Sequence, residues 1–273
     1  MSEETPSVSL DMLATRLGKA EDELLVALEK RTMAAKYLRD ALEGDGNPLS
    51  MAIITSLERM ALQGQTGNLD ELLLRWAVEF QMVMADVGLE RVFVTGSEPL
   101  RIFDQARSIF GHRVPMSFEK DPRDTLTFCL EQPSTAGVLG WMTQAGSGQW
   151  WPALNESRYH DLRIIGGWPV IGGEAPLAAI VSKGPLTRTT TGHSVLMAHD
   201  DQHRLKRIFS DLELETSEFA RARSLVLFKL SVSLSETDPR LTSARSAGLD
   251  GLRVVGTLPD WTEASHGQTG ASA

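Results

Sequence analysis

The chain has 273 residues, of which 42% are hydrophobic and 23% charged, and its formal net charge at pH 7 is −9. This composition is that of a soluble globular protein and argues against a disordered or membrane class. The acidic balance argues against nucleic acid as a partner, because phosphates need a basic protein face. A small anionic metabolite remains compatible where a few cations converge locally.

Residues 10–43 are predicted to form one long helix, in which apolar residues recur at steps of three and four. This spacing predicts a seam buried against partner helices. The seam positions are Leu13, Leu17, Ala20, Leu24, Ala27, Arg31, Ala34, Leu38 and Ala41. Arg31 is the only ionised residue among them. Because an unpaired guanidinium in such a seam costs on the order of several kcal/mol, we expect a carboxylate, a wet cavity or an anionic ligand beside it.

Two shorter helices, over 49–62 and 69–89, complete a three-helix unit. They are bounded by glycine-rich breaker runs at 44–48 and 63–67. Alone, the first helix would overhang these shorter neighbours and leave its seam exposed. The sequence therefore predicts a symmetric dimer that pairs the seam.

After Gly88 the periodicity changes to alternating strands and helices, which indicates one α/β lobe. The predicted strands are 92–95, 114–118, 136–141, 162–165 and 177–181, with helices over 100–110 and 121–131. The glycine-rich segment 166–173 lacks the residues of a phosphate loop, so a turn-rich crossover is favoured. Cys129 is the only cysteine. It lies in an apolar segment, which favours a buried inert thiol over a nucleophile.

A linker predicted over 182–192 separates the lobe from a third block, in which strands and helices alternate differently. Strands are predicted over 193–198, 225–232 and 252–257, and helices over 202–212 and 239–248. If 213–222 is also extended, the order is β-α-β-β-α-β, which is the ferredoxin-like arrangement. The histidines at 193, 199 and 203 do not have a convincing metal spacing, so no metal is expected.

Short segments in each of the three blocks match one known pattern. They are 57–64 and 68–70 in the first block, 109–111, 118 and 136–140 in the second, and 192–200 and 252–259 in the third. In this order they resemble the bacterial bifunctional chorismate mutase/prephenate dehydratase with its C-terminal ACT domain. The chain also resembles shorter mutase-like proteins that carry a Trp-Trp pair, here Trp150-Trp151.

The resemblance implies three domains. These are a chorismate mutase-like helical domain over 8–90, a prephenate dehydratase-like single α/β lobe over 91–182 and an ACT-like domain over 192–262. It also implies a homodimer, no cofactor and, because no leader or membrane span is expected, a cytoplasmic location.

The implied activity is the rearrangement of chorismate to prephenate, which is pericyclic and relies on cations that clamp two carboxylates. The family's inner arginine falls on Arg31. Its leading arginine falls on Ala14, its lysine on Leu42, its Arg-Glu pair on 52–53 and its glutamine in the vicinity of Leu89. Because each lost charge-assisted contact is worth about 1.5–3 kcal/mol, we expect weak or lost turnover.

Four further residues are candidates for binding the substrate: Arg16, Arg39, Glu79 and Gln81. A solvated position is the simpler interpretation for both arginines, and an exposed ion pair with Arg75 is the simpler one for Glu79. The Trp150-Trp151 pair could stack on an aromatic ligand, but packing is the commoner role of such pairs.

The other two blocks depart further from the family. Only eleven residues separate Ile165 from Leu177, where the dehydratase carries a second lobe, so dehydratase activity is not expected. The glycine that admits an amino acid ligand in ACT domains falls on His203. The alternative to a mutase is therefore a non-catalytic sensor or regulator that binds chorismate, prephenate or an aromatic amino acid.

Overall fold

The computed structural model describes residues 9–41, 88–132, 134–140, 149–168, 178–186 and 192–258. The chain divides into two compact units, residues 1–43 and 44–273. The helix predicted over 49–62 lies outside the described residues. So does the helix predicted over 69–89, apart from its last two positions. Those two positions, Gly88 and Leu89, are not helical.

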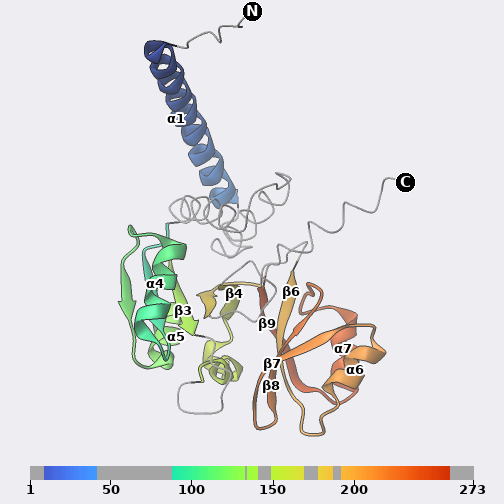
Figure 1. Cartoon of the computed structure of the whole chain (residues 1–273). Coiled ribbons are helices and arrows are strands. Elements are labelled where there is room, and N and C mark those ends of the chain that lie inside the picture. Colours follow the sequence, from blue (N-terminus) through green and yellow to red (C-terminus); the bar gives the residue numbers. More distant parts are fainter. Residues whose placement is uncertain are drawn as a thin grey trace, which may run out of the picture. The chain divides into compact units, whose positions relative to one another are not determined.

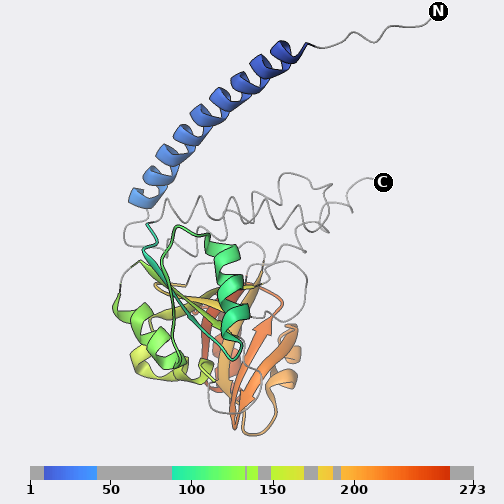
Figure 2. The same cartoon turned by 60° about the vertical axis from the view of Figure 1, so that its left-hand side comes forward.

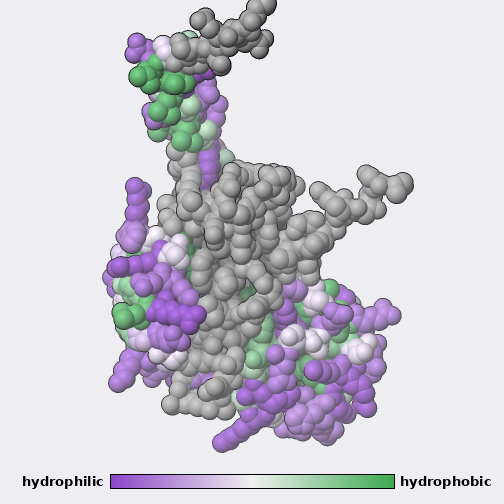
Figure 3. Space-filling view, in the orientation of Figure 1, coloured by the Kyte–Doolittle hydropathy of each residue, from purple (hydrophilic) through white to green (hydrophobic). Residues whose placement is uncertain are grey.

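The first unit contains the helix α1 (Leu10–Ala41), which confirms the long helix predicted from the sequence (Figure 1). Its first turn is capped by Ser9, whose Oγ accepts a hydrogen bond from the N–H of Met12 at 3.3 Å. Apolar side chains of the seam are exposed in this unit: Leu17 is 62% exposed and Leu24 is 58% exposed. Figure 3 shows apolar surface on α1.

The described part of the second unit begins with three parallel strands, β1 (Arg91–Thr95), β2 (Met116–Phe118) and β3 (Thr135–Gly140), in the order β2-β1-β3. Helices α4 (Pro99–Phe110) and α5 (Pro122–Glu131) connect them. Because the two crossovers run to opposite sides of β1, right-handed connections place α4 and α5 on opposite faces of the sheet. Gly137 faces Cys129 of α5, whereas Gly140 faces Ile102 of α4, as this placement requires.

Strands β4 (Leu162–Trp168) and β5 (Ala178–Lys183) extend this sheet, with β5 antiparallel to both β3 and β4. Two 3-10 turns, η1 (Trp151–Asn155) and η2 (Ser157–Tyr159), precede β4. Trp150 and Trp151 are each 1% exposed and belong to the core of this part. Trp150 Nε1 donates to the carbonyl of Gly140 at 2.9 Å. Their burial supports packing as the role of the pair.

The remaining elements are β6 (His193–His199), α6 (Leu205–Asp211), β7 (Thr216–Ala222), β8 (Leu225–Leu230), α7 (Pro239–Ser246) and β9 (Asp250–Leu258). Their strand order is β9-β6-β8-β7. The predicted β-α-β-β-α-β succession is therefore confirmed, including the extended segment before β8. A separate core lies under α6 and α7, where the rings of Phe209 and Phe228 are 5.4 Å apart.

All nine described strands form one sheet, in the order β2-β1-β3-β5-β4-β9-β6-β8-β7 (Figure 2). The sheet is therefore continuous between the two parts that the predicted linker, residues 182–192, was expected to separate. They are joined where β4 and β9 pair in parallel, at Ile164 and Gly256. Arg253 of β9 adds to this junction by donating to the carbonyls of Leu154 at 3.0 Å and His160 at 3.1 Å. Burial lowers the pKa of Arg253. The lobe and the ferredoxin-like part are thus joined through backbone and side chains.

The Cys129 thiol is expected to be unreactive in the folded protein. It is 1% exposed, and burial raises its pKa to about 12. Because the thiolate is the reactive form, labelling by a disulfide reagent at neutral pH should be orders of magnitude slower in the native protein than in guanidinium chloride. Equal labelling rates in the two conditions would contradict this burial.

Candidate functional site

The carboxyl ends of β1, β3, β4 and β9 all meet one edge of the sheet, since these four strands run in the same direction. In open α/β sheets, ligands bind outside the carboxyl ends of the strands, where the strand order reverses. Here the reversal lies beside β1, which has β2 on one side and β3 on the other. By this rule the carboxyl ends of β1 and β3 are a candidate ligand site, called the carboxyl-end crevice.

Two glycines bring the backbone of β1 and β3 close together at this position. A Cβ built on Gly140 would lie 3.2 Å from the Cα of Gly96 and 3.0 Å from Cδ1 of Ile102. The chain then enters α4, whose N-cap residue Glu98 makes no side-chain capping bond and whose first residue is Pro99. N–H groups in a first helical turn attract anions in general. The Glu98 carboxylate, 3.4 Å from Arg101, already places a negative charge at this helix start, so the charge here does not select a class of ligand.

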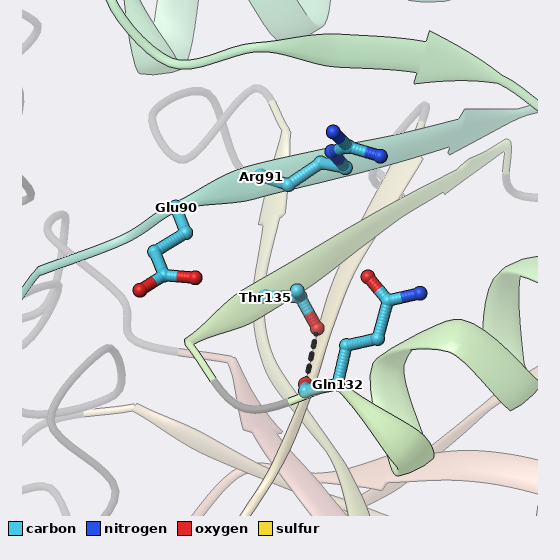
Figure 4. A pocket seen from close by; sticks show the side chains of 4 residues that line it. All are labelled: Glu90, Arg91, Gln132 and Thr135. Carbon is cyan, nitrogen blue, oxygen red and sulfur yellow. Dashed lines mark hydrogen bonds between the residues drawn. The ribbon is translucent and has the colours of Figure 1, made fainter.

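A pocket of about 350 Å³ lies at the opposite edge of the sheet, lined by Glu90, Arg91, Gln132 and Thr135 (Figure 4). Thr135 Oγ1 donates to the carbonyl of Gln132 at 2.8 Å, while Glu90 and Arg91 are exposed. This edge carries the amino ends of β1 and β3. Because ligand sites of such sheets lie at the carboxyl ends, we assign no binding role to this pocket.

The structure places three of the predicted mutase residues, Arg16, Arg31 and Arg39, on α1. Arg31 is half-buried and takes part in an interaction, whereas Arg16 is exposed. Arg39 lies within the helix, but its side chain is outside the described set, as are Glu79 and Gln81 altogether. Too few of these side chains are described to tell whether they lie together, so the predicted site stays a prediction.

The loop between β6 and α6 keeps a glycine-like backbone although it carries a histidine. His203 has a φ of 53°, in the left-handed region. The loop is organised by Asp200, which is 4% exposed and accepts from the N–H of Arg204 at 2.7 Å and from Arg221 at 3.5 Å. The backbone at residue 203 is thus one that glycine adopts readily, although the chain carries histidine there.

We expect His203→Gly to raise the free energy of unfolding by about 0.5–1 kcal/mol. The left-handed conformation costs a non-glycine residue about 1–2 kcal/mol, and the greater freedom of glycine in the unfolded chain offsets part of the gain. The neighbouring substitution Gln202→Gly, at a residue without a positive φ, should lower it instead. Urea denaturation of both variants measures the difference, and a loss of stability in the first would contradict the assigned strain.

Sequence reasoning did not single out the contacts of His199 with two other residues. Its Nδ1 lies 3.1 Å from Oγ of Ser224, and its Nε2 lies 3.5 Å from Nδ2 of Asn155. No spacing in the sequence signals this group, because 44 residues separate Asn155 from His199 and 25 separate His199 from Ser224.

Two kinds of feature are absent from the described residues. No group of three or more His, Cys, Asp or Glu side chains in these ranges could hold a metal ion. Among the helices of the described ranges, none combines the length and apolarity needed to cross a bilayer.

Comparison with known proteins gives a partial structural likeness. No protein-family model matches the sequence, and no curated protein matches it. A solved structure described as "GqqA- a novel type of quorum quenching acylases" is 14% identical with a TM-score of 0.42, covering 62% of this chain and 94% of that chain. A prephenate dehydratase from Streptococcus mutans is 8% identical with a TM-score of 0.42, covering 62% of this chain and 97% of that chain.

A prephenate dehydratase is thus among the partial structural neighbours. At these TM-scores we derive neither activity nor ligand from either likeness.

Proposed function

We propose that the chain is a chorismate mutase-family protein of aromatic amino acid metabolism that holds a small anionic metabolite at Arg31, with weak or absent turnover. The observation that carries the proposal is the burial of Arg31. It is half-buried, whereas the other described side chains of α1 are exposed, leaving aside Gly18. A guanidinium that gives up part of its hydration needs an anionic or hydrogen-bonding partner. Arg31 already takes part in an interaction. Chorismate and prephenate, with two carboxylates each, would add charge-assisted hydrogen bonds to it.

Purified protein incubated with chorismate, followed by its ultraviolet absorbance, tests turnover. A weak mutase should consume chorismate faster than buffer does, lose this rate in Arg31→Ala and keep it in Arg16→Ala. Arg16 is the matched control because it is an exposed arginine on the same helix. Consumption at the buffer rate would remove the catalytic part of the proposal and leave the binding part.

The exposed seam of α1 supports a homodimer. Leu13, Leu17 and Leu24 are 48%, 62% and 58% exposed and share one face by their helical spacing. Contiguous apolar surface of this kind marks an interaction site in soluble proteins. We propose that a second copy of the chain covers this seam, because the seam continues through Arg31 and a dimer would enclose the proposed ligand there.

Size-exclusion chromatography with light scattering tests the dimer. Leu17→Glu together with Leu24→Glu should convert it to a monomer by placing two charges in the seam. Val26→Glu is the control, because residue 26 lies about 200° around the helix from residue 24 and is itself 50% exposed. A wild-type monomer would overturn this proposal.

The second candidate function is a non-catalytic sensor. It is favoured by the continuity of the sheet, which connects the carboxyl-end crevice of β1 and β3 to the ferredoxin-like part through the β4–β9 junction. Thermal-shift screening against chorismate, prephenate, phenylalanine, tyrosine and tryptophan tests it, since a ligand that binds only the folded state raises the melting temperature. A shift that Gly140→Val abolishes and Arg31→Ala leaves intact would place the ligand in the crevice. No shift with any of the five would contradict the sensor.

A further inference from the structure

The structure holds a hydrogen-bonded serine and histidine that the proposed function does not use. Ser224 Oγ lies 3.1 Å from Nδ1 of His199, and Asn155 Nδ2 lies 3.5 Å from Nε2 on the other side of the ring. All three residues are partly exposed. The succession from hydroxyl to imidazole to amide is that of a nucleophile, its base and the group that orients the base.

The turn that carries Ser224 is strained. Ala222 pairs with Leu225, so Arg223 and Ser224 are the two central residues of the β7–β8 hairpin. Arg223 has a φ of 57°, a conformation that two-residue hairpins usually assign to glycine, asparagine or aspartate. Backbone strain of this kind concentrates at functional sites.

The backbone around the turn supplies two further features. The N–H of Asp200 donates to the carbonyl of Ser224 at 2.8 Å, so the turn is already attached to β6 without the side-chain contact. The Ser224–His199 bond is therefore not needed to hold the hairpin. In a two-residue hairpin the N–H groups of the central residues lie outside the strand ladder, where they can stabilise negative charge beside a nucleophile.

We propose that Ser224 and His199 hydrolyse small activated esters, with Asn155 as a positioning residue. Oγ of Ser224 attacks the ester carbonyl carbon while Nδ1 of His199 takes the hydroxyl proton. The carbon–oxygen bond to the alcohol then breaks, and the imidazolium returns the proton to the leaving oxygen. Water attacks the acyl-serine, His199 takes its proton and passes it to Ser224 Oγ, and a carboxylic acid leaves.

This sequence uses the tautomer in which Nε2 of His199 carries the proton. Nε2–H then donates to the amide oxygen of Asn155, which a half-turn of the amide group presents, since its oxygen and nitrogen occupy equivalent positions. Asn155 thereby fixes the ring with Nδ1 free to accept from Ser224. It acts only through His199.

Hydrolysis of p-nitrophenyl acetate by the full chain tests the pair. Ser224→Ala and His199→Gln should each lower the rate on the order of 100-fold, the usual contribution of a general base and its nucleophile. Ser217→Ala, an exposed serine on the neighbouring strand β7, should leave it unchanged. Wild-type hydrolysis no faster than Ser224→Ala would overturn the proposal.

Mass spectrometry keeps the test decisive if a variant unfolds. A fluorophosphonate added to the wild-type protein should modify Ser224, identified by peptide mapping, and a label found only elsewhere would overturn the proposal. For the positioning role, Asn155→Leu should lower kcat and leave KM unchanged, because the amide does not touch the ester. A rise in KM alone would show that Asn155 contacts substrate instead. None of these outcomes depends on binding at Arg31.

Discussion

Gly256→Ala should destabilise the second unit by about 3 kcal/mol, because a single methyl group there cannot be accommodated. A Cβ built on Gly256 would overlap the carbonyl oxygen of Ile164 and lie 2.5 Å from its Cβ. The obstruction includes backbone, so no rotamer change relieves it. Ile164 and Gly256 are also the residues through which β4 and β9 pair. The substitution is expected to part the sheet at the junction of its two halves.

Gly251→Ala, five residues earlier in β9, is the control, because a methyl group there meets a smaller obstruction. Its Cβ would meet only Cδ2 of His199, at 3.3 Å, although its φ of +64° adds a strain of about 1–2 kcal/mol. Denaturant unfolding followed by tryptophan fluorescence should therefore show a clearly larger loss for Gly256→Ala than for Gly251→Ala. Similar losses would mean that the β4–β9 pairing does not hold the two halves together.

Trp151→Ala should lower the free energy of unfolding by about 3–5 kcal/mol, the range for removing a large aromatic side chain from a core. Trp151 is 1% exposed and packs in the cluster that contains Leu126, Cys129 and Tyr159. Because the ring is buried in this cluster, its removal leaves a cavity. Thermal unfolding measures the loss. Phe118→Ala is the control, since Phe118 is 38% exposed at the end of β2 and should cost far less.

The two tryptophans should also respond differently to phenylalanine. Trp150 Nε1 donates to the carbonyl of Gly140, whereas Trp151 Nε1 has no hydrogen-bond partner among the described residues. Trp150→Phe therefore leaves a carbonyl at the end of β3 without this donor, a penalty of about 1–3 kcal/mol beyond the lost volume. Equal losses for Trp150→Phe and Trp151→Phe would contradict the assigned hydrogen bond.

Periodicity was sufficient to predict most of the described elements. The strands β1, β6 and β8 are short apolar runs bounded by turns, and α1 repeats its apolar residues every three or four positions. Each of these signals is local. The order of strands in the ferredoxin-like part also followed from the succession of elements, because few arrangements of β-α-β-β-α-β are sterically accessible.

The junction between the halves of the sheet could not be predicted in this way. It rests on a backbone approach between Ile164 and Gly256 and on hydrogen bonds from Arg253 to two carbonyls, and nothing local in the sequence marks either contact. The group of Ser224, His199 and Asn155 was missed for the same reason. Arg31 is half-buried although its described seam neighbours Ala27 and Ala34 are exposed, so its predicted place in a buried interhelical seam stays a prediction.

Calorimetric titration of chorismate into the full chain tests the central claim, that Arg31 holds an anionic metabolite. The wild-type protein and Arg16→Ala should bind with the same affinity. Arg31→Ala should bind about 10- to 150-fold more weakly, the effect of losing one charge-assisted contact of 1.5–3 kcal/mol. Equal affinity of the wild type and Arg31→Ala, or no heat of binding to the wild type, would contradict the account.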